Sequence, residues 1–162
     1  MASGDTLLVF TPLQNEPPDS DFATIDLRNN HPVLDFDATT DEYAVFRGVM
    51  PRNYSGSGIT VYIHYAMSSA TSGDVGWYVS FERIGDQQQD IDGDSFAQAL
   101  LVEVDVPGTS GLVDIASVAF NDGSQIDNIQ AGEGFRLRVQ RDADGDSAVG
   151  DAELLVVELK EA

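Results

Sequence analysis

Residues 134–142 read GFRLRVQRD, and the pattern of this stretch decides the fold. Phe135, Leu137 and Val139 alternate with polar side chains. Successive side chains of a β-strand point to opposite faces of the sheet, so a period of two is typical of a strand that is half buried. We therefore predict that the three apolar residues face a hydrophobic core and that the polar residues between them face solvent.

Similar segments, alternating or rich in β-branched and aromatic residues, recur along the chain. Stretches rich in glycine, proline, aspartate, asparagine and serine separate them, and these residues favour turns. We expect an all-β fold, an antiparallel jelly-roll-like β-sandwich of about 8–10 strands. Residues 95–100 (SFAQAL) are either one helical turn or the approach to a strand. The predicted strands lie within 6–10, 21–27, 32–36, 42–50, 59–67, 75–84, 99–106, 112–120, 134–142 and 152–159.

The first part of the chain differs from the rest. Four of the six prolines fall within residues 12–32, and proline cannot donate to a strand ladder. We interpret residues 1–32 as an extended N-terminal arm that packs on a neighbouring subunit, and residues 33–162 as the jelly-roll domain. The alternative is an edge strand on its own sandwich. The predicted assembly contacts of the arm are Leu7, Val9, Phe10 and Phe22.

The composition argues against several partners and chemistries. The 162 residues include 28 acidic and 8 basic side chains, so the formal net charge is −20. Such a surface repels nucleic acid and anionic membranes, and we predict neither as a partner. Without cysteine the sequence has no disulfide, thiol nucleophile or cysteine-ligated metal. We identify no signal peptide and no long apolar segment of the kind that crosses a membrane.

Catalytic motifs are missing from the sequence. A serine hydrolase needs a histidine beside its nucleophile, and only His31 and His64 are available. We interpret both as structural or surface residues. The sequence contains no phosphate-binding loop, dinucleotide fingerprint or nucleophile elbow. We predict that the protein is not an enzyme.

Two hexapeptides of the same form, DIDGDS at 90–95 and DADGDS at 142–147, are candidate calcium loops. Aspartates two residues apart in a tight turn can direct their oxygens at one hard cation. The second hexapeptide departs from an EF-hand, because Ser147 replaces the expected glycine and the flanks are predicted strands. The alternative is a pair of acidic turns whose carboxylates bind backbone amides. The candidate calcium ligands are Asp142, Asp144, Asp146, Glu153, Asp90, Asp92 and Asp94.

Aromatic side chains provide a second candidate site. Tyrosines beside Arg47 or Arg52 are able to form a platform that stacks on sugar rings and binds their hydroxyls. Trp77 lies in an alternating segment with its apolar neighbours, so we interpret it as a core residue. Tyr54, in the glycine- and serine-rich loop at 51–58, is predicted to be exposed and to stack on a glycan. The aromatic residues considered are Tyr43, Tyr54, Tyr62, Tyr65, Trp77 and Tyr78.

Four segments carry a resemblance to a known family: NEPPDSDFATIDLRNNHPVLDFDATTDEYAVFRGVMPRNY (15–54), ATSGDVGWYVSFERI (70–84), AGEGFRLRVQRD (131–142) and GDAELLVVEL (150–159). In them the chain resembles small jelly-roll virion proteins of tailed bacteriophages and environmental viruses. The resemblance implies a homotrimer on the surface of the virion that contacts other virion proteins such as the major capsid protein. Its signatures are strands and turns, so it implies no set of functional residues.

We therefore expect a non-enzymatic structural protein of a bacteriophage virion. It would decorate or stabilise the capsid, or build part of a fibre-like appendage, through packing between subunits. The alternative function is a receptor- or glycan-binding β-sandwich module. Binding to sugars would favour the alternative, and failure to bind any sugar would favour the structural role.

Overall fold

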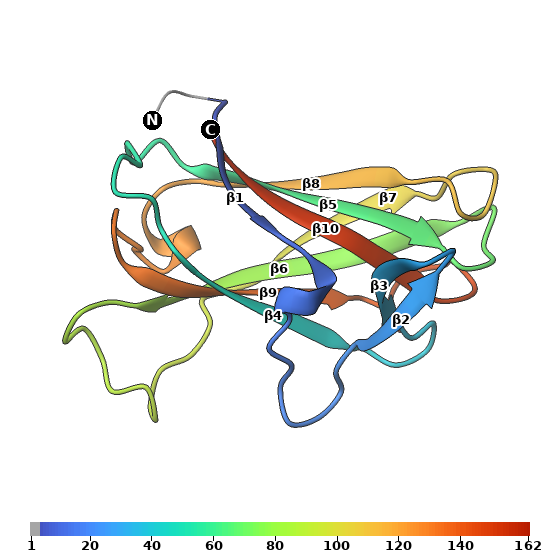
Figure 1. Ribbon diagram of the computed structural model, residues 1–162, viewed down its shortest axis with the longest axis horizontal. Helices are drawn as coiled ribbons and strands as arrows, with labels where there is room; N and C mark the ends of the chain where they lie inside the picture. Colours follow the sequence, from blue (N-terminus) through green and yellow to red (C-terminus); the bar gives the residue numbers. More distant parts are fainter. Residues whose placement is uncertain (1–3) are drawn as a thin grey trace.

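The computed structural model describes residues 4–162, and these residues form two antiparallel sheets packed face to face (Figure 1). Sheet A contains, in spatial order, β2 (Thr24–Arg28), β3 (His31–Phe36), β10 (Ala152–Glu161), β5 (Ile59–Met67) and β8 (Asp114–Phe120), with β1 (Thr6–Phe10) also paired to β10. Sheet B contains, in spatial order, β4 (Tyr43–Val49), β9 (Gly134–Arg141), β6 (Asp74–Ile84) and β7 (Leu100–Asp105). Two short 3-10 turns, η1 (Pro12–Gln14) and η2 (Ser124–Ile126), are the helical segments of the described chain.

This arrangement confirms the prediction of an all-β, jelly-roll-like sandwich with about ten strands. Of the two alternatives for residues 95–100, the structure shows the approach to a strand, because residues 95–99 contain no helix and β7 begins at Leu100. No helix in residues 4–162 has the length and apolar character that a membrane crossing requires.

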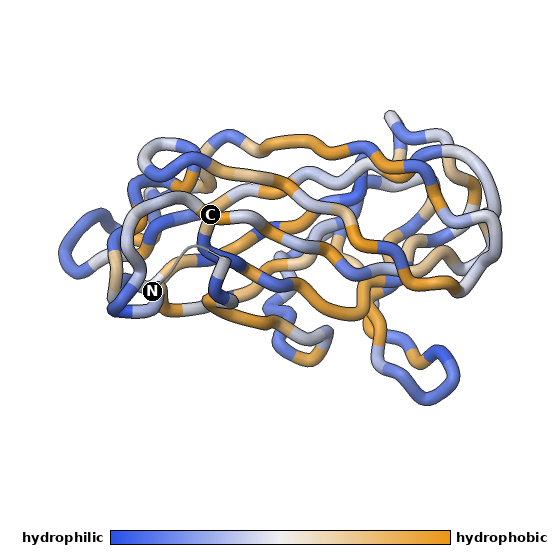
Figure 2. Tube along the Cα trace, turned by 90° about the horizontal axis from the view of Figure 1, so that it is seen from above, coloured by the Kyte–Doolittle hydropathy of each residue, from blue (hydrophilic) through white to orange (hydrophobic). Residues whose placement is uncertain are grey.

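The strand that decides the fold is β9, which lies between β4 and β6 in sheet B. Leu137 is opposite Phe46 of β4 on one side and Phe81 of β6 on the other, and all three side chains are fully buried. The polar residues between the apolar ones face outward, as predicted. Figure 2 shows the same alternation as orange and blue segments that succeed each other along the strands.

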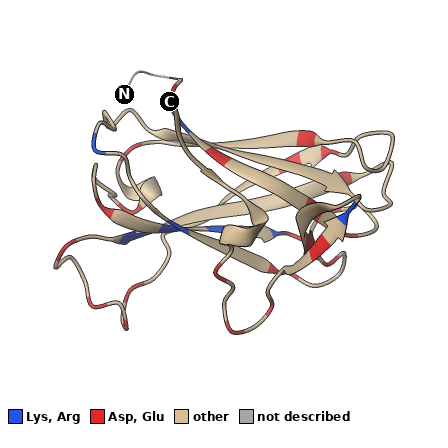
Figure 3. Ribbon diagram, in the orientation of Figure 1, with Lys and Arg blue, Asp and Glu red and all other residues tan. Residues whose placement is uncertain are grey.

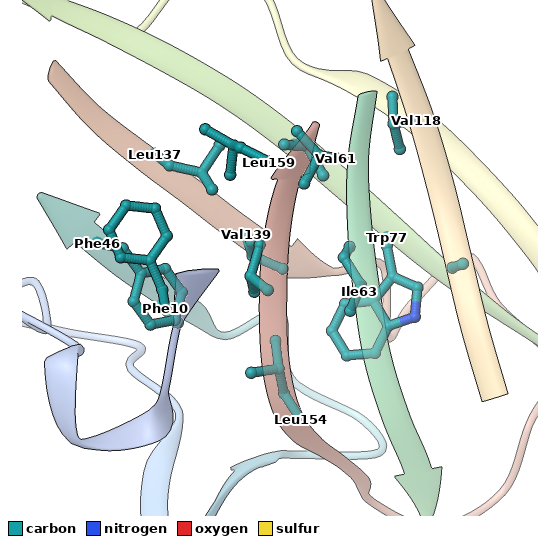
Figure 4. Packing of buried hydrophobic residues seen from close by; sticks show 14 of the residues in the cluster. Phe10, Phe46, Val61, Ile63, Trp77, Val118, Leu137, Val139, Leu154 and Leu159 are labelled. Carbon is teal, nitrogen blue, oxygen red and sulfur yellow. The ribbon is translucent and has the colours of Figure 1, made fainter. Parts of the chain in front are cut away.

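The core fills the space between the sheets. The edges of aromatic rings meet there: Phe36 and Tyr65 of sheet A lie 5.1 and 5.6 Å from the ring of Trp77 in sheet B. A second contact joins Phe81 to Phe120 at 5.0 Å. Figure 4 shows side chains of both sheets directed at one another. Trp77 is fully buried, which confirms its predicted place in the core.

The N-terminal stretch forms part of the sandwich in the described chain. β1 pairs with β10, so the edge-strand alternative describes Thr6–Phe10. The segment after η1 then follows the free edge of β4, where Asn15 bridges to Phe46, before β2 returns to sheet A. The boundary predicted between residues 32 and 33 falls inside β3, which begins at His31.

Burial corrects part of the assembly prediction. Leu7 and Phe10 are 8% and 3% exposed, and the ring of Phe10 stacks on Phe46 at 5.4 Å. Both side chains contact the core of their own domain, so their predicted role as contacts to a partner is wrong. Val9 and Phe22 are 49% and 40% exposed and remain accessible.

A buried ion pair holds one end of the sandwich. Arg141, at the end of β9, is fully buried, and its Nε and Nη2 donate to the carboxylate of Asp146 at 2.9 and 3.2 Å. Its guanidinium also donates to the carbonyl oxygens of Ala148 and Gly150 at 2.9 and 2.7 Å. One side chain therefore fixes the loop between β9 and β10 against the end of the core.

We expect Asp146→Ala to destabilise the protein by about 3–5 kcal/mol, because it leaves the guanidinium of Arg141 buried without its counter-ion. Urea denaturation followed by tryptophan fluorescence measures the change. Asp144→Ala is the matched control, since Asp144 is exposed in the same loop. Equal unfolding midpoints for the two variants would contradict the role given to the ion pair.

Candidate ligand-binding cleft

The outer face of sheet B gathers aromatic and cationic side chains. In one row across the strands, Tyr43 of β4 and Tyr78 of β6 both lie opposite Gln140 of β9. In the next row, Arg138 of β9 lies between Val45 and Ser80. A third row joins Arg47, Arg136 and Glu82.

Two loops border this face, and both extend from the same side of the sandwich (Figure 1). The first is residues 15–23, attached to β4 by the bond from the backbone N–H of Glu16 to the carbonyl of Val45 at 2.7 Å. The second is residues 85–99 between β6 and β7, attached by the bond from the N–H of Ala97 to the carbonyl of Phe81 at 2.8 Å. The second loop brings Phe96 over β9.

A cleft of about 360 Å³ lies between the two loops. This volume is within the usual range of small-molecule sites, which is about 300–1,000 Å³. Two aromatic rings, two arginines, a carboxylate and a hydroxyl reach it, so it offers both apolar and hydrogen-bonding surface. Its lining residues are Glu16, Pro17, Pro18, Ser20, Tyr43, Val45, Phe96, Arg136 and Arg138.

Arg138 is the central polar group of the cleft. Its guanidinium lies 4.5 Å from the centre of the Phe96 ring and 5.3 Å from that of Tyr43. Both distances suit cation–π attraction. Burial lowers the pKa of Arg138 below its usual range, although an arginine remains charged at neutral pH.

The adjacent arginine has a different environment. The guanidinium of Arg136 donates to both carboxylate oxygens of Glu82, at 3.1 and 2.8 Å. This bidentate pair raises the pKa of Arg136 and keeps its charge compensated. Arg47, further along β4, pairs with Glu16 at 3.3 Å. Figure 3 shows blue segments on the strands of sheet B, and red segments both in the loops and on several strands.

The structure corrects the glycan site predicted at Tyr54. The ring is only 8% exposed, because the hydroxyl donates to Asp122 at 2.9 Å and accepts from the N–H of Gly58 at 3.1 Å. Burial raises the pKa of Tyr54, and the hydrogen bond to Asp122 acts in the same direction, whereas the bond from the N–H of Gly58 opposes it. The prediction that Tyr54 is exposed is therefore wrong, and Tyr43 is the tyrosine that lines the cleft.

Phe96 was missed by the sequence prediction. It lies within residues 95–100, for which the sequence predicts a helical turn or the approach to a strand. Nothing in the neighbouring residues indicates that Phe96 lies over sheet B. One signal was present: Phe96 is a large aromatic residue at the end of a long polar loop. Such a residue usually contacts another part of the molecule, because exposing it to water is unfavourable.

The candidate calcium ligands are separated by the fold. Asp142 and Asp144 come together with Asp41, and one carboxylate oxygen of each lies within 4.8 Å of the others. Asp146 instead pairs with buried Arg141, and Glu153 pairs with Arg28 at 2.8 Å in sheet A. Asp41 was not predicted, because it precedes β4 and is distant in sequence. Burial raises the pKa of Asp142, with smaller contributions from Asp144 and Asp41.

The other hexapeptide shows the alternative arrangement in part. Asp90 accepts a hydrogen bond from the N–H of Asp92 at 3.0 Å, and Asp94 accepts one from the N–H of Ser95 at 2.9 Å. In the described chain its three aspartates do not form a cluster of metal-ligating oxygens. Calcium binding stays a prediction for both loops.

A second, larger groove of about 510 Å³ lies over sheet A, between the turn after β2 and residues 110–113. Its main polar groups, Arg28 and Glu153, bind each other, and Arg28 also donates to the carbonyl of Met67 at 2.9 Å. No aromatic ring other than that of His31 lines it. The cleft on sheet B therefore has the stronger recognition chemistry.

Asp35 lies next to this groove, opposite Glu153 in the pairing of β3 with β10. Burial raises its pKa to about 6, and the charges of Asp151, Glu153 and Asp26 act in the same direction. The ionised form of Asp35 is thus disfavoured in the folded protein.

Solved structures of known proteins resemble this fold. The chain is similar to the CBM35 module from Cellvibrio japonicus Abf62, with a TM-score of 0.52 and 11% identity over 94% of this chain and 91% of that one. It is also similar to the xylan-binding module CBM15, with a TM-score of 0.50 and 12% identity over 96% of this chain and 97% of that one. At such identities the likeness shows the fold alone.

Two further comparisons bear on the viral resemblance. A structure of infectious bursal disease virus aligns with a TM-score of 0.34 and 12% identity, over 96% of this chain and 32% of that chain, which is too low to carry an argument. No protein-family model matches the sequence, and no curated protein matches it. The fold class thus defined is a jelly-roll β-sandwich of the kind found in carbohydrate-binding modules.

The calcium prediction is tested by calorimetry with the full chain. If the 142–147 loop binds the ion, calcium gives heat of binding that Asp144→Asn reduces, because that change removes one of three clustered carboxylates. Asp92→Asn is the matched control in the other hexapeptide, which lacks the cluster. The absence of heat at millimolar calcium would contradict the prediction.

We expect Asp35 to reduce the stability of the protein as the pH rises from 3.8, its pKa in the unfolded chain, to about 6, its pKa in the folded state, because the folded state holds this proton more tightly. Asp35→Asn should stabilise the protein at pH 8, on the order of 1 kcal/mol once solvent screening is allowed for, and should flatten this dependence. Thermal unfolding at several pH values measures both effects. Asp19→Asn, which removes an exposed charge, is the control, and equal behaviour of the two variants would refute the assignment.

Proposed function

We propose that the protein is a carbohydrate-binding β-sandwich module without catalytic activity, and that the cleft on the outer face of sheet B is its binding site. The observation that carries this proposal is the placement of the rings of Tyr43 and Phe96 next to the guanidinium of Arg138 in a cleft. Aromatic rings offer flat apolar surface to the C–H face of a sugar, and a guanidinium donates hydrogen bonds to its oxygens.

The position of the cleft supports this proposal. Its side chains come from strands of the sheet as well as from two loops, so part of the site is rigid before any ligand arrives. Preorganisation of this kind lowers the entropic cost of binding. The similarity of the fold to the two carbohydrate-binding modules is consistent with such a function.

The virion role stays a prediction, as do the homotrimer, the capsid partner and the location on a virus particle. Exposed apolar side chains around edge strand β2 are the surface that such packing would use, and Phe22 is the predicted contact among them. Deleting the predicted arm would also remove β1 and β2 from sheet A. The exposed apolar residues near β2 are Leu13, Phe22, Ile25 and Leu27.

We expect Tyr43→Ala and Phe96→Ala each to weaken binding to oligosaccharides by about two- to tenfold, because each removes an apolar ring surface from the cleft. A glycan array with the labelled full chain identifies ligands, and titration calorimetry with the strongest of them measures the change in Kd.

Tyr62→Ala is the matched control. Tyr62 is also a half-buried tyrosine with a cationic neighbour, Lys160 at 5.8 Å, but it lies on the outer face of sheet A. Its loss should leave Kd unchanged. If the array shows no binding to any glycan, or if Tyr62→Ala weakens binding as much as Tyr43→Ala, the proposed site is wrong.

A further inference from the structure

Arg138 differs from most other arginines of the protein in that no carboxylate pairs with it. Five of the seven arginines form ion pairs with a carboxylate, whereas the guanidinium of Arg138 forms neither a hydrogen bond nor an ion pair within residues 4–162. It is nevertheless half buried. The five paired arginines are Arg28, Arg47, Arg83, Arg136 and Arg141.

A half-buried cation without a counter-ion is unfavourable, because it has lost part of its hydration. The rings of Phe96 and Tyr43 offset part of this cost through their faces, yet they accept none of its N–H groups. The hydroxyl of Ser80, directly opposite Arg138 in the pairing of β6 with β9, is also buried without a hydrogen-bond partner. Ser80 therefore lacks the partner that a buried polar group normally has, and Arg138 beside it has no counter-ion.

The surrounding charges define what a partner must be. Glu82 is bound by Arg136, and Glu16 is bound by Arg47, so their charges are compensated. Arg138 leaves one positive charge uncompensated in a protein whose net charge is −20. Its planar N–H groups match the geometry of a carboxylate, which accepts two parallel hydrogen bonds. A ligand with several closely spaced negative charges would be repelled by the rest of the surface.

We infer that the cleft recognises a sugar that bears a single carboxylate, a uronic acid unit within an otherwise neutral glycan, and that Arg138 binds this carboxylate. This inference rests on the proposed function and adds the class of ligand to it. The sugar ring lies against the aromatic wall of the cleft, and its carboxylate supplies the counter-ion that the protein itself does not provide.

The test compares pairs of ligands that differ in one group. Methyl β-glucuronide and methyl β-glucoside, together with xylotetraose with and without one glucuronic acid branch, are titrated into the full chain. We expect the carboxylated member of each pair to bind about tenfold more tightly at low salt, with a smaller preference at high salt. A sulfated glucoside tests whether any anion suffices.

Arg138→Gln should weaken binding of the carboxylated ligand much more than binding of the neutral one, and so remove the preference between them. Arg138→Lys should retain part of the preference, because it keeps the charge but loses the planar fork. Arg52→Gln is the control, since it removes an exposed positive charge elsewhere. Circular dichroism confirms that each variant is folded, and the comparison of ligands on the unmodified protein does not depend on any variant.

The outcomes separate this inference from the proposed function. Equal binding of neutral and carboxylated sugars would overturn the inference and leave the glycan-binding function intact. Stronger binding of the sulfated sugar would overturn the assignment to a carboxylate. If none of these sugars binds and the glycan array also shows no binding, both the inference and the proposed function are overturned. A carboxylate preference that Arg138→Gln abolishes and Arg52→Gln preserves would support the inference.

Discussion

The alternation along β9 determines both the core and the cleft. Phe135, Leu137 and Val139 fill the space between the sheets, and the pleat of the strand then requires Arg136 and Arg138 to lie on the opposite face. A shift of one residue in register would place the arginines in the core and the apolar side chains in water. The hydrophobic contacts that stabilise the sandwich therefore also hold the cationic side chains where the two loops close around them.

The charges of the protein are arranged unevenly around this framework. Most acidic residues lie in loops and at strand ends, where water screens them, while three of the seven arginines lie together on the outer face of sheet B. At the end of β9, Arg141 faces the core and is satisfied entirely by Asp146 and backbone carbonyls. Two arginines of one strand thus have opposite roles: Arg141 organises a loop, and Arg138 is left with donors that face a cleft.

The proposed function rests on the contrast between Arg138 and Arg141 more than on the fold. Jelly-roll sandwiches serve many functions, so similarity to carbohydrate-binding modules at 11–12% identity does not by itself assign one. A cleft with two rings and an arginine without a counter-ion is more specific, because it combines apolar surface with unpaired hydrogen-bond donors. The exposed apolar side chains near β2 show no comparable chemistry, and the viral role inferred from strand and turn signatures has no such site.

Much of the fold followed from local pattern. The period of two identified the strands and the buried position of Trp77, since the faces of a strand are set by adjacent residues.

The positions of loops were not determined in this way. Tyr54 and Phe96 both lie in polar stretches, yet hydrogen bonds to Asp122 and Gly58 bury the first, and the course of the β6–β7 loop places the second over Arg138. Asp41 lies beside Asp142, and Asp146 pairs with Arg141 instead of lying in this cluster. Both arrangements depend on contacts between residues on different strands and loops. The sequence by itself determined which residues form strands and which of their faces is apolar, because these depend on near neighbours, whereas the cleft and its partners depend on contacts between distant segments, which only the tertiary structure decided.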